Sequence, residues 1–171
     1  MAADELLLQT SRFQVVRRTQ SLADGTAHNR EIVVHPGAVV ILPLLGDGRV
    51  CLIRNQRIAV GEELIELPAG TLNPGEDPLE TARRELAEET GYQAECWQRL
   101  HEFWMSPGIL NERMHLYLAT GLEPGPAAPE VGEQIRTLVV PWEEALELID
   151  AGQIRDAKTL ASLLYYDRLP K

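Results

Sequence analysis

The chain has 171 residues, of which 44% are hydrophobic and 25% charged, a composition typical of one globular domain and not of a disordered or fibrous chain. Its formal net charge of −10 argues against nucleic-acid binding, which needs a concentrated basic surface, but metal ions or a few arginines could still admit a small phosphate-bearing substrate. No apolar run approaches the roughly 18–20 residues needed to cross a bilayer. The acidic N-terminal segment lacks the features of a signal peptide, so we expect a cytoplasmic protein.

Strand-forming segments dominate the chain. We expect β-strands at residues 12–20, 31–36, 37–45, 49–56, 63–68, 94–105, 113–120 and 135–140, with a hairpin turn at 46–48. Glycine and proline predict loops at 70–76 and 121–133, and helices are expected at 77–90, 142–151 and 156–168. One strong helix among many strands predicts a mixed α+β sandwich, in which helices pack on a sheet.

Four apolar or sulfur-containing side chains have ordinary structural interpretations. Cys51 and Cys96 form no CxxC pattern, and we interpret both as buried free thiols. Phe103 and Trp104 could stack on a ligand ring, but we interpret both as core residues.

The helix at 77–90 is marked by signals at both ends. Asp77 is a suitable N-cap, Pro78 suits the first helical position, and Glu80 has the spacing of a capping box. Gly91 follows the last helical residue, where a left-handed backbone ends many helices.

Three glutamates of this helix converge on one face. Glu85, Glu88 and Glu89 follow the i, i+3, i+4 spacing, and at about 100° per residue Glu89 falls beside Ala82 at the edge of the apolar stripe. Like charges so close to the core repel one another, and a divalent cation with oxygen ligands would remove the repulsion. The alternative is a solvated acidic helix that the arginines at 83–84 screen.

The sequence around these glutamates resembles a known signature. Gly70 is followed after five residues by Glu76, and after seven more by Arg84-Glu85-Leu86-Ala87-Glu88-Glu89-Thr90-Gly91-Tyr92. This resembles the Nudix box of the Nudix hydrolases, GX5EX7REUXEEXGU, where U is a bulky apolar residue. Tyr92 is aromatic where an aliphatic residue is commoner.

The resemblance implies a role for each matching position. Glu85, Glu88, Glu89 and the backbone carbonyl of Ala69 would be ligands of Mg²⁺ or Mn²⁺, with more than one ion per site, and Glu85 and Glu89 would thereby serve catalysis. The structural positions of the box would be Gly70, Glu76, Arg84 and Gly91, with Arg84 orienting the glutamates through ion pairs.

Features outside the box are similar to the ADP-ribose pyrophosphatase branch of the family. The segment 52–70 resembles that branch, although Asn55 and Gln56 stand where Gln and Tyr are more usual. The similarity implies that Arg57 binds phosphate; the alternative is an ordinary surface charge.

Further downstream, the resemblance implies that Pro107, Gly108 and Glu112 bind substrate, although Pro107-Gly108 could equally be a turn that ends a strand. In the loop before the last strand, Glu133 matches the general base of this branch, with Glu130 as an alternative.

The expected fold is therefore the Nudix α/β/α sandwich, with an N-terminal antiparallel β segment over 1–40 at a homodimer interface and the Nudix domain over 41–171. The implied reaction is metal-dependent hydrolysis of ADP-ribose, or a related nucleotide sugar, to AMP and ribose 5-phosphate, with no nucleic-acid or membrane partner. The alternatives are hydrolysis of nucleoside triphosphates or of GDP-mannose, a non-catalytic nucleotide sensor, and an acidic scaffold without a ligand.

Overall fold

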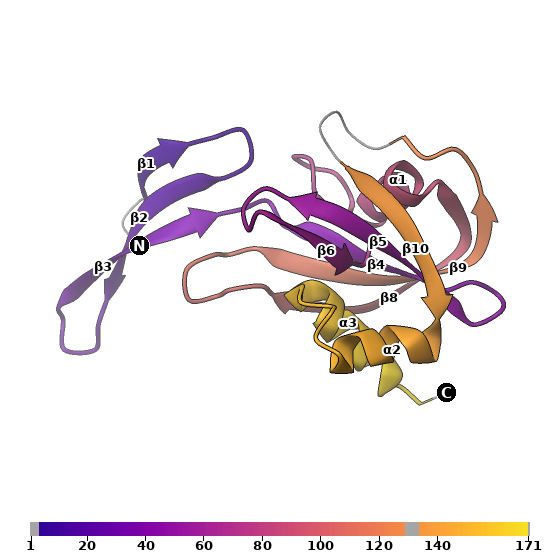
Figure 1. Cartoon of the computed structure of the whole chain (residues 1–171). Helices are drawn as coiled ribbons and strands as arrows, with labels where there is room; N and C mark the ends of the chain where they lie inside the picture. The colour runs from indigo at the N-terminus through magenta and orange to yellow at the C-terminus, as the bar shows by residue number, and fades with distance from the viewer. Residues whose placement is uncertain (1–3, 129–133, 171) are drawn as a thin grey trace.

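The structure is a computed structural model that describes residues 4–128 and 134–170 (Figure 1). Within these residues the elements are β1 (Glu5–Gln9), β2 (Gln14–Ser21), β3 (Ala27–Val34), β4 (Ala38–Pro43), β5 (Arg49–Arg57), β6 (Glu62–Glu66), β7 (Ala69–Thr71), α1 (Pro78–Thr90), β8 (Tyr92–Trp104), β9 (Arg113–Pro124), β10 (Ile135–Pro141), α2 (Trp142–Asp150) and α3 (Ala157–Asp167). None of the described helices is long and apolar enough to cross a membrane.

The described strands form three sheets. The sheet β1-β2-β3 stands to one side of the molecule, and the loop between β8 and β9 reaches toward it (Figure 1). The second sheet has the order β10-β5-β6, and the third the order β7-β4-β9-β8. In the third sheet β4 runs parallel to β9 and antiparallel to β7, so the sheet is mixed.

The core forms on both faces of β4, whose six residues are all buried. Val40 and Leu42 belong to a cluster with β5, β6, α2 and α3, while Val39 and Ile41 pack with Ala82 and Leu86 of α1. A strand with apolar residues on both faces must lie inside the molecule. Helices therefore flank the sheets on opposite sides (Figure 1), which confirms the predicted α+β sandwich.

Helix α1 begins and ends as its sequence predicts. The Asp77 side chain accepts a hydrogen bond from the Leu79 amide at 2.8 Å, and Gly91 adopts the left-handed conformation at φ 75°. Glu80 differs from the expectation, because its carboxylate is paired with Arg83 and not with the N-cap. A Cβ at Gly91 would also lie 2.4 Å from the Gly125 carbonyl, so close packing adds a second requirement for glycine here.

Some local expectations were wrong. The strand β1 was not predicted, β7 occupies the start of the loop expected at 70–76, and β9 continues into the loop expected at 121–133. Pairing with β2, β4 and β8 stabilises these segments, and such pairing is not visible in local sequence.

Two side chains expected in the core are exposed instead. Cys96 lies on an outward-facing position of β8, whereas Cys51 is buried. Trp104 is 48% exposed at the end of β8, where the Arg113 guanidinium lies 4.8 Å from its ring. Phe103 does pack against the core.

Candidate active site

The glutamate face of α1 lies against the short strand β7. Glu89 is only 3% exposed, and its Oε2 accepts a hydrogen bond from the Ala69 amide at 2.9 Å. In a strand the N–H and C=O of one residue point to the same side, so the Ala69 carbonyl also faces α1 and not β4. The structure thus brings the predicted carbonyl and the predicted glutamate together.

Gly70 allows an equally close approach of Glu85. A Cβ built on Gly70 would lie 1.9 Å from Cδ and from Oε1 of Glu85, well inside van der Waals contact. A Cβ at this position would force the end of the Glu85 side chain away from β7. The glycine therefore provides space for the carboxylate at a position where the backbone needs no left-handed conformation.

The Arg84 guanidinium forms ion pairs with three carboxylates. It lies 3.2 Å from Glu76, 2.8 Å from Glu85 and 3.0 Å from Glu88. Burial alone would lower the pKa of Arg84, but these glutamates raise it above its ordinary value. In return, Arg84 above all, together with the Asn73 amide, lowers the pKa of Glu76 to about 2.

These contacts decide how a metal could bind. In residues 4–128 and 134–170, no three His, Cys, Asp or Glu side chains are grouped as a ready-made metal site, because Arg84 holds Glu85 and Glu88. The donor set itself suits a hard cation, since it offers carboxylate oxygens and a carbonyl. The Glu85 carboxylate lies against Gly70, the residue after that carbonyl. By their chemistry, these donors fit Mg²⁺ or Mn²⁺.

Arg57, the predicted phosphate ligand, belongs to a neighbouring ion-pair network. Its Nε and Nη2 donate to Glu66 at 2.8 and 2.7 Å, and Glu66 also accepts from Lys158 of α3. Burial raises the pKa of Glu66, but Arg57 and Lys158 together lower it by more than burial raises it. The pKa of Glu66 is therefore below its ordinary value. The negative charge of Glu89 adds to that of Glu66 in raising the pKa of Arg57, which links this network to the glutamate face.

Sequence reasoning missed Glu66 and Lys158. A signal was present for Glu66, because it is a charged residue between the apolar Ile65 and Leu67 in the strand expected at 63–68. Lys158 carries no comparable signal, since a lysine in the first turn of a helix is ordinary and its partner lies far away in sequence.

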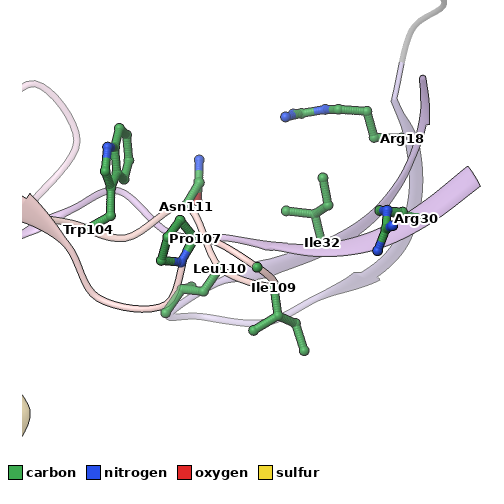
Figure 2. A pocket seen from close by; sticks show the side chains of 9 residues that line it. Arg18, Arg30, Ile32, Trp104, Pro107, Ile109, Leu110 and Asn111 are labelled. Atoms are coloured by element: carbon green, nitrogen blue, oxygen red, sulfur yellow. The ribbon is translucent and has the colours of Figure 1, made fainter. Parts of the chain in front are cut away.

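Pro107 and Gly108 lie outside the glutamate face of α1. They line a pocket of about 290 Å³ between the β8–β9 loop and the N-terminal sheet (Figure 2), and none of the nine residues that form it belongs to the glutamate face. Arg18 and Arg30 face the loop from β2 and β3 across this pocket. Glu112 lies at the end of the same loop, 3.6 Å from His35.

The family comparison agrees with this geometry. The NUDIX domain family matches residues 34–163, a span that contains α1, β7 and Arg57. The chain belongs to the Nudix family. The family membership expected from the box is thereby confirmed, over residues 34–163.

Individual proteins similar to this Nudix chain are known. An ADP-ribose pyrophosphatase of Bacillus subtilis is 38% identical over 146 residues, which cover 84% of this chain and 79% of that protein. A GDP-mannose pyrophosphatase of Escherichia coli O1:K1 is 37% identical over 148 residues, 81% of this chain and 77% of that protein. The crystal structure of an ADP compounds hydrolase matches with a TM-score of 0.84 at 23% identity, over 96% of this chain and 90% of that one, and it shows the same fold.

The predicted general base Glu133 and its alternative Glu130 lie outside the described residues. The described ends of that loop are both hydrogen-bonded to the Nudix domain. The Ala128 amide donates to the Glu88 carbonyl at 2.9 Å, and the Gln56 amide donates to the Gln134 carbonyl at 3.5 Å. One end of the loop therefore starts at the helix that carries the glutamates.

Proposed function

We propose that this Nudix chain hydrolyses the pyrophosphate bond of ADP-ribose, with AMP and ribose 5-phosphate as products. The observation that carries the proposal is the contact between α1 and β7, where Ala69 holds Glu89 and Gly70 admits Glu85. This contact places oxygen donors of two elements side by side, as a site for a charged phosphate substrate requires. The similarity to the B. subtilis ADP-ribose pyrophosphatase supports the choice of substrate.

Four groups would hold Mg²⁺ or Mn²⁺, with more than one ion per site: Glu85, Glu88, Glu89 and the Ala69 carbonyl. Divalent ions bound there would neutralise phosphate oxygens and acidify a water. The chain's own contribution is to fix Glu89 on the Ala69 amide and to keep Glu85 and Glu88 within reach of Arg84. Arg84 neutralises these carboxylates when they face it, which limits their mutual repulsion.

Five further residues would act on the substrate. Arg57 would bind a phosphate, because its guanidinium is ion-paired on one edge and 37% of its side chain is exposed. Glu133 would be the general base, and the anchoring of Ala128 on Glu88 supports a loop that begins beside the site. Pro107, Gly108 and Glu112 would bind the part of the substrate farther from the glutamates, in or near the pocket of Figure 2.

The chain would act as a homodimer. We infer that the N-terminal segment over 1–40 lies at the interface and the Nudix domain spans 41–171, because the sheet β1-β2-β3 stands apart and exposes large apolar side chains. Those side chains are Leu6, Leu7, Leu8, Phe13 and Leu22. A cytoplasmic location accords with the two cysteines, which are both free.

The reaction is tested by incubating the purified chain with ADP-ribose and Mg²⁺ or Mn²⁺ and separating the products by chromatography. We expect AMP and ribose 5-phosphate, and a loss of at least about a hundredfold in kcat for Glu89→Gln, because the neutral amide at this buried position removes a negative charge that would hold the cation. Glu80→Gln is the matched control, since Glu80 lies on the same helix and pairs only with Arg83 among the described residues. No product with either ion would overturn the proposal.

GDP-mannose is the second candidate substrate, because the similar E. coli protein is a GDP-mannose pyrophosphatase. The same assay with GDP-mannose separates the two, since the products are then GMP and mannose 1-phosphate. A kcat/KM for GDP-mannose that exceeds the value for ADP-ribose would change the assigned substrate while leaving the reaction class intact.

A further inference from the structure

Glu66 is a fully buried carboxylate at the end of β6, with 0% of the residue exposed. A charge at such a place is strongly unfavourable unless cations and hydrogen bonds compensate it. Two cations do so here: Arg57 in a two-bond geometry, and Lys158, which is itself only 7% exposed. Since replacing such a network by apolar residues is often neutral for stability, its presence beside the glutamate face needs another explanation.

The geometry of Arg57 supplies one. Nε and Nη2 both donate to Glu66, which fixes the plane of the guanidinium. Its third nitrogen, Nη1, donates no hydrogen bond to any of the residues in 4–128 and 134–170, so that nitrogen is available to a ligand. Its partner Glu66 lies three residues before Ala69, whose amide donates to Glu89, so this pair is close to the glutamate face along the chain. The charge of Glu89 also raises the pKa of Arg57.

Lys158 connects this pair to α3. Its Nζ contacts Glu66 and lies 2.9 Å from Asp156, the N-cap of the helix. The Thr159 hydroxyl accepts a hydrogen bond of 2.8 Å from the amide of Leu67, the residue directly after β6. The first turn of α3 is thus bound to the end of β6 at two neighbouring points, and the Lys158 ammonium occupies a fixed position.

We propose that Lys158 is a positioning residue for the reaction: it holds Glu66, and through Glu66 it fixes Arg57 so that Nη1 meets a phosphate of the substrate. The inference rests on the proposed function, because it assumes a phosphate substrate beside the glutamates. The Oε2 atom of Glu66 is shared between Arg57 and Lys158. Without the ammonium the carboxylate is free to turn, and the guanidinium turns with it.

The test compares Lys158→Met with Arg155→Gln. The control removes a nearby ion pair, between Arg155 just before α3 and Glu62 of β6, that does not involve Arg57. With ADP-ribose and Mg²⁺, we expect Lys158→Met to raise KM about tenfold with kcat changed less than about twofold, because a misplaced binding group weakens binding steeply. Lys158→Arg should recover most of the loss, and the control should match the unsubstituted chain.

A double variant separates positioning from a structural role. If Lys158 acts through Arg57, Lys158→Met adds no further loss in an Arg57→Ala background, because the group it positions is gone. An equal loss in both backgrounds overturns the inference while the proposed function stands. Should Lys158→Met fail to fold, Glu66→Gln in the same two backgrounds serves instead, since it keeps the shape of the side chain and loses its charge.

A second readout does not depend on turnover. The Nε–H proton of Arg57, assigned by its loss in Arg57→Ala, should give a slowly exchanging NMR signal in the unsubstituted chain. The signal should exchange at least about tenfold faster in Lys158→Met and not in Arg155→Gln. An unchanged signal in Lys158→Met overturns the inference. If the chain hydrolyses no nucleotide sugar, the proposed function fails, and this signal still decides whether Lys158 fixes Arg57.

Discussion

At residue 70, the absence of a side chain leaves room for the Glu85 carboxylate of α1 beside β7. In Gly70→Ala the new Cβ would lie 1.9 Å from Cδ of Glu85, so the carboxylate must move away from β7. We expect kcat with ADP-ribose to fall by at least about tenfold, since misplaced groups at a reacting centre cost rate steeply. Gly46→Ala is the control, because a Cβ there meets nothing within 4 Å. Equal turnover in the two variants would contradict the argument.

Also at the scale of single residues, the Glu76 carboxylate makes the stability of the folded chain depend on pH. Arg84 lowers the pKa of Glu76 from 4.5 to about 2, so the unfolded chain takes up this proton at a higher pH than the folded chain. The stabilisation is therefore fully present above pH 4.5 and is lost as the pH falls toward 2.

In urea unfolding, we expect the free energy of unfolding to decrease as the pH falls from 4.5 to about 2, and to decrease less in Glu76→Gln, which has no proton to bind. Glu80→Gln, with its carboxylate exposed on α1, should follow the unsubstituted chain. Parallel pH profiles for all three chains would show that the Arg84 contact contributes nothing to acid stability.

At the scale of elements, α1 depends on the hydrogen bond at its N-cap. The Asp77 side chain accepts a hydrogen bond of 2.8 Å from the Leu79 amide. This bond satisfies one of the backbone N–H groups that have no partner within the helix at its start. Asp77→Ala should reduce the free energy of unfolding by about 1 kcal/mol, whereas Asp77→Asn should cost only a few tenths. Urea unfolding of both variants measures the difference, and a larger loss for the asparagine variant would contradict the capping role.

How much of an element can be predicted depends on where its determinants lie. The ends of α1 were predictable because Asp77 and Gly91 act on the backbone within one turn of themselves. The strand β7 was not, because Gly70 has low strand propensity and the segment is held by β4 on one side and α1 on the other.

The same distinction applies to the site. The i, i+3, i+4 spacing was enough to place Glu85, Glu88 and Glu89 on one helical face, with Glu89 at the edge of the apolar stripe, and the structure shows that Glu89 is buried. The pairing of Glu66 with Lys158 joins residues 92 positions apart, and only the packing of α3 against β6 brings them together.

At the scale of the whole molecule, the sheet β1-β2-β3 is the part that a single chain leaves most exposed. Leu6 is 56% and Leu8 50% exposed on its outer strand β1, whose far edge has no paired strand among the described residues. Exposed apolar side chains gathered on one edge are typical of a surface that another protein covers. In the homodimer proposed above, a second copy of the chain would cover this edge.

The double variant Leu6→Glu, Leu8→Glu tests this assembly. We expect sedimentation to show a dimer for the unsubstituted chain and a monomer for the variant, because two carboxylates per chain cannot be buried at an apolar interface. Ile58→Glu is the control, since Ile58 is 95% exposed in the β5–β6 turn, outside this sheet. If the partner's sheet also completes the substrate pocket, the monomer loses affinity for ADP-ribose while the contact between Gly70 and Glu85 stays intact. A dimer that survives both glutamates would place the interface on another surface.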